Sequence, residues 1–377
     1  YEAVVHELLA KVCSCANPAD LDEQQRSDLL SATLEQPLHV PTLELSDESR
    51  EALALFRLLR RVVHAYGRQA LGAHVVSMTR RPSDVLSVLW LWRHADADRA
   101  EGDQHAGSLE QTPPLPVVPL FETIDDLQRA GKVFEQLLCN NAYRRQLVGQ
   151  ANRQMIMLGY SDSTKDGGYL AACWSLYRCQ RNLQEIASRE EIDLTFFHGR
   201  GGALGRGGGP AARSILSLPA GTFHGSLRLT EQGEVLADRY DDPRIAYRHL
   251  EQIIWSALLA SGSSSVTAKQ EWIDTMERMS DRSFEAYRKL VDLPGFVEFF
   301  RRATPISEIE QMPIGSRPSR RRGGGGLSDL RAIPWVFSWT QSRCLIPAWF
   351  GFGSSMADML DDSSAAAELR AMFRGWP

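Results

Sequence analysis

The most constraining feature of the chain is a glycine-rich stretch at residues 193–210, DLTFFHGRGGALGRGGGP, which begins with an apolar run. Glycine lets a backbone adopt positive φ and approach a ligand closely because it has no Cβ. Successive N–H groups in such a turn form an anion-binding nest. The loop also carries Arg200 and Arg206, whose planar guanidinium groups can bind a phosphate or carboxylate with two hydrogen bonds. The stretch therefore predicts a strand followed by an ordered catalytic loop, residues 198–210, that binds a small, multiply charged anion.

Glycine- and arginine-rich sequence has a second interpretation, because flexible RNA-binding tails share this composition. Here the apolar residues 194–197 precede the loop and SILSLP at 214–219 follows it, so the loop is embedded in folded sequence. RNA binding also favours aromatic residues between the arginines, and residues 198–210 contain no Phe, Tyr or Trp. A non-catalytic anion- or RNA-binding protein that uses Gly/Arg-rich loops stays the alternative.

Size and composition narrow the class of protein. A chain of 377 residues is long enough for one large α/β barrel or two smaller domains. A net charge of -5 argues against a nucleic-acid-binding surface across the whole protein. No apolar run reaches the roughly 18 residues of a transmembrane helix, and no signal peptide is evident. The six dispersed cysteines are typical of reduced thiols, so a cytoplasmic protein without nucleic-acid or membrane partners is expected.

Apolar strand-like segments alternate with helical ones through the middle of the chain. The strand-like segments lie in residues 73–79, 115–123, 153–170 (with the apolar run MIMLGYS at 155–161), 194–197 and 224–235. This alternation predicts a parallel sheet, open or closed into a barrel, with strands buried on both faces.

Long helical patterns precede this region. A helix is predicted after Ser46 or Asp47 and is expected to end at Gly67. Its expected buried face carries apolar residues at helical spacing, as do the tryptophans of the next helix. These predicted core residues are Leu55, Leu58, Leu59, Val62, Val63, Trp90 and Trp92.

Polar side chains follow three predicted strands at the same relative place. Glu122 follows VVPLF, Asp162 follows MIMLGYS with Lys165 just beyond, and His198 and Arg200 follow LTFF. The carboxyl ends of parallel barrel strands share one face, where active sites lie. A single Asp after a strand is more often a helix cap, but two carboxylates on one face, without nitrogen or sulfur ligands, suit Mg²⁺ or Mn²⁺. We therefore predict that Glu122 and Asp162 bind the metal.

A second basic, glycine-rich loop spans residues 315–331, GSRPSRRRGGGGLSDLR. An exposed basic run is usually a solvated surface, but four glycines after three arginines are also typical of a lid that closes over an anion. Arg317 and Arg331 are expected to face inward, because each adjoins proline or an apolar, strand-like segment.

Several long segments resemble the phosphoenolpyruvate carboxylase family, in that family's order. They are SMTRRPSDVLSV, PLFETIDDL, GYSDSTKDGG, FHGRGGALGRGGGP, LRLTEQGE and GSRPSRRRGGGGLSDLRAIPW, and the resemblance extends from near residue 1 to near residue 355. It implies a mostly helical (βα)₈ TIM-type barrel, with residues 1–377 forming a single catalytic barrel domain, as a fragment. It also implies a homotetramer for the full-length protein.

The resemblance further implies a lyase (a carboxy-lyase) that fixes carbon dioxide and supplies oxaloacetate to the tricarboxylic acid cycle. Bicarbonate and phosphoenolpyruvate would give oxaloacetate and phosphate through carboxyphosphate and a metal-bound enolate. The matching motifs assign Mg²⁺ or Mn²⁺ to Glu122 and Asp162, and catalytic or anion-binding roles to His198, Arg200, Arg206, Arg317, Arg331 and Lys165.

Two features depart from the family pattern. Ala211 and Ala212 stand where Thr-His is common, so the anchoring of the loop is expected to differ. The chain begins at Tyr1 and stops at Pro377 within or just after helical patterns, so a fragment cut at both ends is expected. An essential histidine and one arginine of the family belong to an N-terminal part outside these residues. We therefore expect the isolated chain to be inactive.

Overall fold

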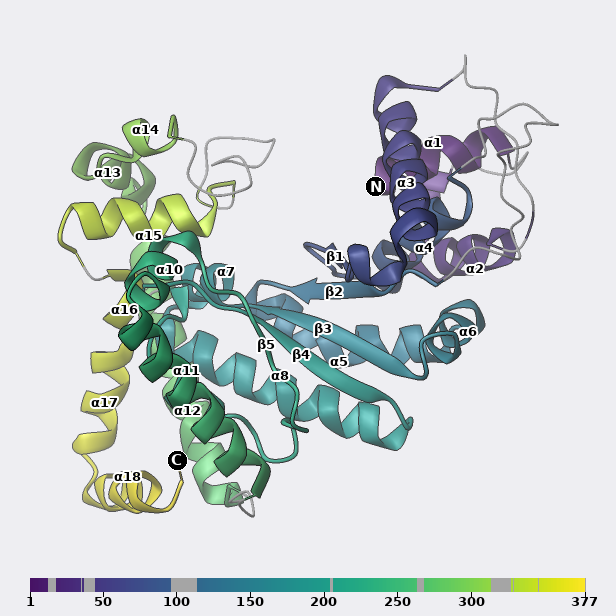
Figure 1. Cartoon of the computed structure of the whole chain (residues 1–377). Helices are drawn as coiled ribbons and strands as arrows, with labels where there is room; N and C mark the ends of the chain where they lie inside the picture. The colour runs from purple at the N-terminus through teal and green to yellow at the C-terminus, as the bar shows by residue number, and fades with distance from the viewer. Residues whose placement is uncertain are drawn as a thin grey trace. The chain divides into compact units, whose positions relative to one another are not determined.

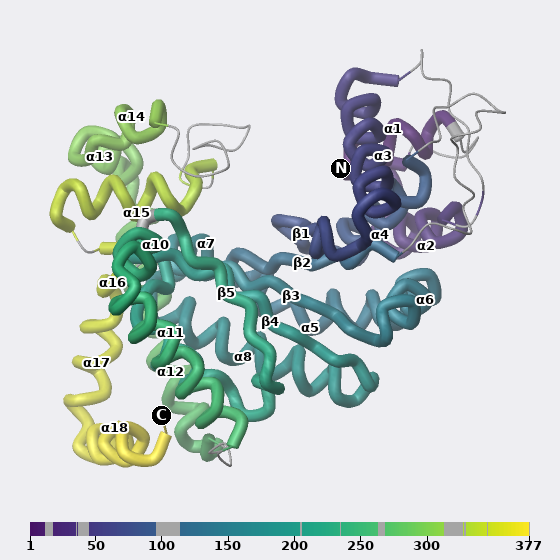
Figure 2. The backbone as a smooth tube through the Cα atoms, in the orientation of Figure 1, coloured from purple at the N-terminus to yellow at the C-terminus, as the bar shows by residue number. Residues whose placement is uncertain are grey.

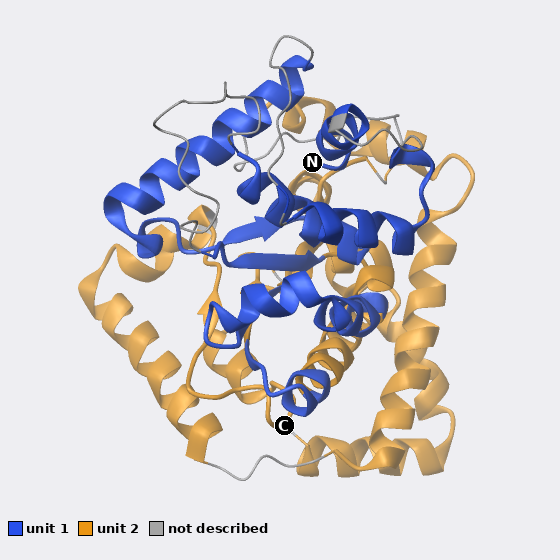
Figure 3. Cartoon of the chain, turned by 90° about the vertical axis from the view of Figure 1, so that its right-hand side faces the viewer, with its two compact units in different colours: residues 1–121, 129–157, 185–194 blue, residues 122–128, 158–184, 195–377 orange. Residues whose placement is uncertain are grey.

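The computed structural model divides the chain into two compact units, which Figure 3 colours separately. Unit 1 comprises residues 1–121, 129–157 and 185–194, and unit 2 comprises residues 122–128, 158–184 and 195–377. The structure describes residues 1–12, 18–34, 36, 45–95, 114–203, 206–262, 268–312, 327, 329–344 and 346–376. Most of the second basic loop, including Arg317, lies outside the described residues.

Five strands form one sheet in the order β1-β2-β3-β4-β5, and Figure 2 traces β3 and β4 side by side. The strands are β1 (His74–Val76), β2 (Val117–Phe121), β3 (Arg153–Gly159), β4 (Asp193–Gly199) and β5 (Arg228–Leu229). β1 pairs with β2 in parallel from His74↔Val117, and β4 pairs with β5 in parallel at Phe197↔Arg228. The predicted parallel α/β sheet is confirmed, and its closure into a (βα)₈ barrel stays a prediction.

Burial along the strands differs from the expectation that all are covered on both faces. β2 is buried at every residue, whereas β3 and β4 bury every second residue. On β4 the buried positions are Leu194, Phe196 and His198. Successive side chains of a strand point to opposite faces, so β4 places His198 on the same buried side as its apolar residues.

Helices make up most of the remaining structure (Figure 1). Those up to the end of β4 are α1 (Glu2–Val12), η1 (Pro18–Asp20), α2 (Glu23–Thr33), α3 (Asp47–Tyr66), η3 (Arg68–Ala70), α4 (Pro82–Arg93), α5 (Ile124–Cys139), α6 (Asn141–Val148), α7 (Tyr160–Gly167) and α8 (Tyr169–Arg189). Those after β4 are α9 (Ala211–Leu216), α10 (Gly233–Tyr240), α11 (Pro243–Gly262), α12 (Gln270–Val291), α13 (Phe296–Ala303), α14 (Ile306–Ile309), α15 (Ala332–Gln341), α16 (Ile346–Trp349), α17 (Phe352–Leu360) and α18 (Ser363–Gly375).

Helix α3 has the predicted ends but not the predicted buried face. The Ser46 side chain caps its first turn, and Gly67 ends it with φ 83. Leu55 and Leu58 are 40% and 49% exposed, so assigning them to the core was wrong. Val63 is buried as predicted, and the other buried residues, Ser49, Ala52, Leu53 and Phe56, form a neighbouring stripe on the same helix. Both stripes satisfy the helical period, and packing against α1 and α4 selects the second. Trp90 and Trp92 of α4 are buried as predicted.

The predicted strand-like segment after the second basic loop is a helix, α15, so that interpretation was wrong. Pro334 is tolerated because the first turn of a helix needs no partner for its N–H groups. Trp335 and Trp339 lie one turn apart on α15 and pack against Phe300 of α13, with ring centroids 4.9 and 5.2 Å from it. This aromatic core, shared by α12, α13, α14 and α15, fixes the start of α15 at Arg331.

In the described part of the chain, no helix is long and apolar enough to cross a membrane.

Candidate functional site

The two predicted metal ligands lie where neighbouring strands end. Glu122 directly follows β2 and is 2% exposed, and Asp162 lies half-buried in the first turn of α7, which directly follows β3. The backbone N–H of Ile124 donates to Oδ2 of Asp166 at 3.0 Å. A Cβ on Gly167 would come within 2.8 Å of Cγ1 of Ile124. The turn carrying Glu122 therefore packs directly on the helix carrying Asp162.

The chemistry of this pair fits a hard divalent cation. Carboxylate oxygens are preferred by Mg²⁺ and Mn²⁺, and Mg²⁺ is usually held by one or two carboxylates plus water and substrate. Among the residues that the structure describes, no group of three or more His, Cys, Asp or Glu is placed to hold a metal ion.

The glycine-rich loop holds itself together through backbone hydrogen bonds. The N–H of Gly201 donates to the Arg206 carbonyl at 2.8 Å, and the N–H groups of Arg206 and Gly208 donate to the Ala203 carbonyl at 2.9 and 2.8 Å. Leu204 and Gly205 lie outside the described residues. These bonds favour the predicted ordered loop over a flexible tail.

Two glycines of the loop occupy positions that no other residue would fit. Gly207 has φ 74, and a Cβ there would lie 2.5 Å from Cδ1 of Tyr160. A Cβ on Gly208 would lie 1.9 Å from the carbonyl oxygen of Gly202. The loop therefore packs tightly on α7 and on its own first half.

Arg200 stabilises the loop by donating hydrogen bonds to uncharged oxygen atoms. Its Nε donates to the Gly207 carbonyl at 2.8 Å, and its Nη1 donates to the hydroxyl of Ser214 in α9. In the part of the chain that the structure describes, no carboxylate lies within hydrogen-bond distance of this guanidinium group. Partial burial lowers the pKa of Arg200, which nevertheless stays charged at neutral pH. Its charge is therefore available to a bound anion.

Arg206 is only 3% exposed and ties the loop to two other motifs. Its Nε donates to the hydroxyl of Ser161 at 3.3 Å, and its Nη2 donates to Oε1 of Gln232. Ser161 lies beside Asp162 in α7, and Gln232 is the N-cap residue of α10. Sequence reasoning missed both partners, although both stand inside the segments GYSDS and LTEQGE that resemble the family.

His198 is 2% exposed and its Nδ1 lies 2.8 Å from the hydroxyl of Tyr160, the first residue of α7. Burial and then the positive charge of Arg200 lower the pKa of His198 to about 4. The imidazole is therefore neutral at pH 7. Tyr160 was also missed, and the available signal was a tyrosine at the head of the helix that carries Asp162.

The remaining candidates lie on elements around α7. Lys165 is half-buried in the last turn of α7, and its carbonyl accepts a 2.7 Å hydrogen bond from the hydroxyl of Tyr287. Arg331 is half-buried at the N-cap of α15, a helix that packs on α7. Unit 2 thus contains every candidate residue that the structure describes: Glu122, Asp162, Lys165, His198, Arg200, Arg206 and Arg331.

A small pocket lies beside the loop, between Arg200, Gly201 and the segment Thr230–Gln232. Glu231 borders it and accepts hydrogen bonds from Arg239 at 2.5 Å and from His249 at 3.1 Å. Burial alone would raise the pKa of Glu231, but hydrogen bonds from Tyr240, Arg239 and His249 outweigh it and lower the pKa. This carboxylate therefore stays ionised and hydrogen-bonded to Arg239 and His249.

Acid should destabilise the fold through its buried histidines. His198 and His94 both have a pKa of about 4, because burial disfavours their charged forms. Unfolded histidine titrates near 6.5, so the folded state binds fewer protons in this window. The contribution of these histidines to the free energy of unfolding is fully present above about pH 6.5 and is lost as the pH falls towards 4. Between pH 7 and pH 5 we expect each histidine to lower the free energy of unfolding by about 2 kcal/mol.

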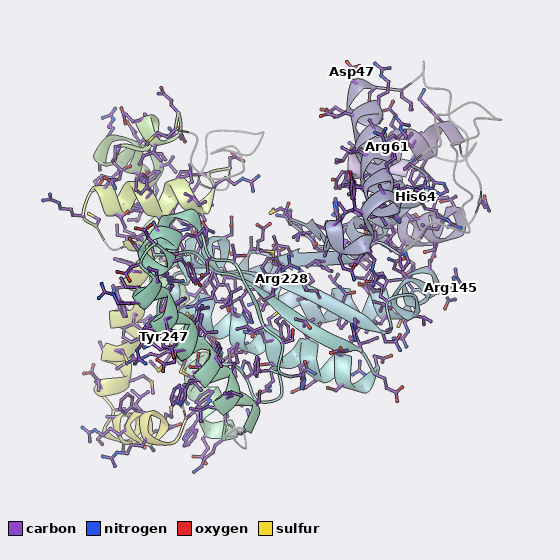
Figure 4. All side chains as sticks on the ribbon, in the orientation of Figure 1. Asp47, Arg61, His64, Arg145, Arg228 and Tyr247 are labelled. Atoms are coloured by element: carbon purple, nitrogen blue, oxygen red, sulfur yellow. The ribbon has the colours of Figure 1, made fainter. Side chains whose placement is uncertain are left out.

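Urea unfolding of His198→Gln at pH 7 and pH 5 checks this expectation, since glutamine does not titrate. The variant should lose less stability on acidification than the parent chain. His64→Gln is the matched control, because His64 is exposed on α3, where Figure 4 labels it. If the parent chain and His198→Gln lost equal stability between pH 7 and pH 5, the low pKa assigned to His198 would be wrong.

Comparisons with known proteins agree on one family. The family model described as phosphoenolpyruvate carboxylase matches residues 1–377. A phosphoenolpyruvate carboxylase from Chromohalobacter salexigens is 43% identical over 100% of this chain and 40% of its own length. Those from Aromatoleum aromaticum and Gloeobacter violaceus are 43% and 41% identical over the whole chain, covering 41% and 40% of their own lengths. The chain thus spans about 40% of the length of the curated relatives it matches.

Proposed function

Because the chain belongs to the phosphoenolpyruvate carboxylase family, we propose that it forms part of a carboxy-lyase that joins bicarbonate to phosphoenolpyruvate. The products are oxaloacetate and phosphate. The observation that carries this proposal is the ordered loop that holds Arg200 and Arg206 beside His198 and against the helix of Asp162.

The arginines are proposed to bind the phosphoryl group and the carboxylate of the substrates. Guanidinium groups pair with such oxygens through two parallel hydrogen bonds, and their charge stabilises a phosphoryl group during transfer. The side chain of Arg200 is already fixed by the Gly207 carbonyl, so little reorganisation is needed when an anion arrives. Arg317 and Arg331 of the second basic loop, and Lys165 of α7, are proposed to add positive charge on the same substrates.

His198 is proposed to contact the substrate anions as a neutral imidazole. Its burial keeps a second positive charge from forming beside Arg200 at neutral pH. The buried position at the end of β4 also excludes water from its ring. Exclusion of water matters in this chemistry because a carbanion-like carbon must react with carbon dioxide before it is protonated.

Glu122 and Asp162 are proposed to hold Mg²⁺ or Mn²⁺. The bound ion would supply a Lewis acid that stabilises negative charge developing on a substrate oxygen. Glu122 contributes a carboxylate fixed by its buried turn, whereas Asp162 lies on α7 and is more accessible.

The complete protein is also proposed to be a cytoplasmic homotetramer, as the family resemblance implies. Phosphoenolpyruvate and bicarbonate are its proposed substrates. Formation of oxaloacetate by the complete protein, coupled to malate dehydrogenase, tests the activity directly. Absence of bicarbonate-dependent NADH oxidation would refute the proposal.

The metal assignment gives a separate prediction. In the complete protein, Asp162→Asn should weaken Mn²⁺ binding by about 10-fold or more, because a neutral amide replaces a charged ligand. Electron paramagnetic resonance of free Mn²⁺ measures the affinity, and the thermal unfolding curve should barely move. Asp193→Asn is the matched control, since Asp193 lies at the opposite end of β4 and pairs with Arg153. Unchanged Mn²⁺ affinity in Asp162→Asn would remove this residue from the site.

A further inference from the structure

The hydrogen bond between Tyr160 and His198 restricts where the protons of the two rings can lie. The phenol oxygen lies 2.8 Å from Nδ1 of the imidazole, and the imidazole is buried whereas Tyr160 is half-buried. Two arrangements of protons satisfy this distance. Either the tyrosine donates to an unprotonated Nδ1, or a protonated Nδ1 donates to the phenol oxygen.

The surroundings of Tyr160 separate these two arrangements. If Nδ1–H were the donor, the O–H of Tyr160 would need another acceptor, because a hydroxyl proton left without one inside a protein is costly. Among the described residues, the hydroxyl of Tyr160 has no second partner within hydrogen-bond distance. The tyrosine is therefore the donor.

A neutral imidazole carries one proton, so occupation of Nδ1 as an acceptor leaves that proton on Nε2. We propose that Tyr160 is a positioning residue that fixes His198 in the Nε2–H tautomer, so that His198 offers a hydrogen-bond donor, rather than a base, to the substrate anions. This inference rests on the proposed function, because it assigns His198 to substrate contact.

Tyr160 also has a packing role, which the test must separate from the proposed one. Its ring lies under the guanidinium group of Arg200, with Cζ 5.9 Å from the centroid, and packs against Gly207. Phenylalanine keeps this ring and removes only the hydroxyl. Tyr160→Phe therefore isolates the hydrogen bond to His198.

The experiment uses the complete protein with ¹⁵N-labelled histidine. Solid-state NMR reports which ring nitrogen carries the proton, and subtraction of the His198→Gln spectrum identifies the His198 signals. Wild type should show a protonated Nε2 and an unprotonated Nδ1, whereas Tyr160→Phe should show the other tautomer or a mixture. Tyr143→Phe is the matched control, because Tyr143 is 1% exposed and donates to Oε1 of Gln154, and neither is a candidate site residue.

Kinetics supply the second readout. Tyr160→Phe should lower kcat about 10-fold, the factor expected for one neutral hydrogen bond, with a smaller change in KM for phosphoenolpyruvate. The amide N–H of glutamine occupies roughly the place of Nε2–H and needs no tautomer. In a His198→Gln background, Tyr160→Phe should therefore cause no further loss.

Each outcome decides the inference. A protonated Nδ1 in wild type would overturn it, as would an equal loss from Tyr160→Phe in both backgrounds. If the wild-type protein forms no oxaloacetate, the proposed function fails and with it the substrate contact of His198. The tautomer is still decided by the NMR spectra, which do not depend on turnover.

Discussion

Replacement of Gly208 with alanine should reduce carboxylation by the complete protein by on the order of 100-fold or more. A Cβ there would lie 1.9 Å from the Gly202 carbonyl oxygen and 2.6 Å from the Ala203 carbonyl oxygen. Both obstacles are backbone atoms, so no side-chain rotation relieves the clash and the loop itself must move. A displacement of about 1 Å at a catalytic group costs about 100-fold in rate. Steady-state oxaloacetate formation measures the effect.

Gly233→Ala is the matched control for this substitution. Gly233 begins α10, and a Cβ there would meet nothing within 4 Å. This variant should therefore retain the activity of the parent enzyme. Circular dichroism should show both variants folded, since the clash in Gly208→Ala is confined to the loop. Full activity in Gly208→Ala would mean that the loop geometry is not part of the catalytic arrangement.

Replacement of Arg200 with lysine should lower kcat/KM by about 100- to 1,000-fold, the loss typical of one preorganised donor to a developing charge. Lysine keeps the positive charge but has a single ammonium group in place of the planar fork. It cannot at once donate to the Gly207 carbonyl and to Ser214, as Arg200 does, and also bind an anion, as we propose for Arg200. Arg206→Lys should act in the same direction.

Arg228→Lys provides the control for arginine chemistry at the same sheet. Arg228 is exposed on β5, where Figure 4 labels it, with its guanidinium group 4.6 Å from the ring centroid of Phe197. We expect its replacement to change kcat/KM by less than about threefold, because substitutions of exposed side chains usually have small effects. If Arg200→Lys were equally mild, Arg200 would only shape the loop. A fall in stability without a fall in turnover would support that same conclusion.

Local sequence was sufficient to predict the parts of the site that depend on neighbours along the chain. The apolar run before His198 predicted β4, and the glycines predicted the ordered loop, because backbone freedom is a property of the residue itself. The caps of α3 at Ser46 and Gly67 were readable for the same reason. The positions of Glu122 and Asp162 after their strands follow from the alternation of strand and helix.

Only the tertiary structure decided which surfaces meet. Two apolar stripes on α3 fit the helical period equally well, and contact with neighbouring helices buried the stripe with Leu53 rather than that with Leu55. The aromatic run after Arg331 became a helix because Trp335 packs on Phe300, which is distant in sequence. The hydrogen-bond partners of the catalytic candidates were likewise decided by contacts between residues that are distant in sequence.

Three supporting residues illustrate why those partners were not predicted. Tyr160 lies 38 residues from His198 in the sequence, Ser161 lies 45 residues from Arg206, and Gln232 lies 26 residues from Arg206. No local pattern encodes these distances in space, because they depend on how parallel strands bring their following turns together. The sequence alone determined the chemical groups and the loop that carries them. The packing of α7 and α10 against that loop determined which side chains meet those groups.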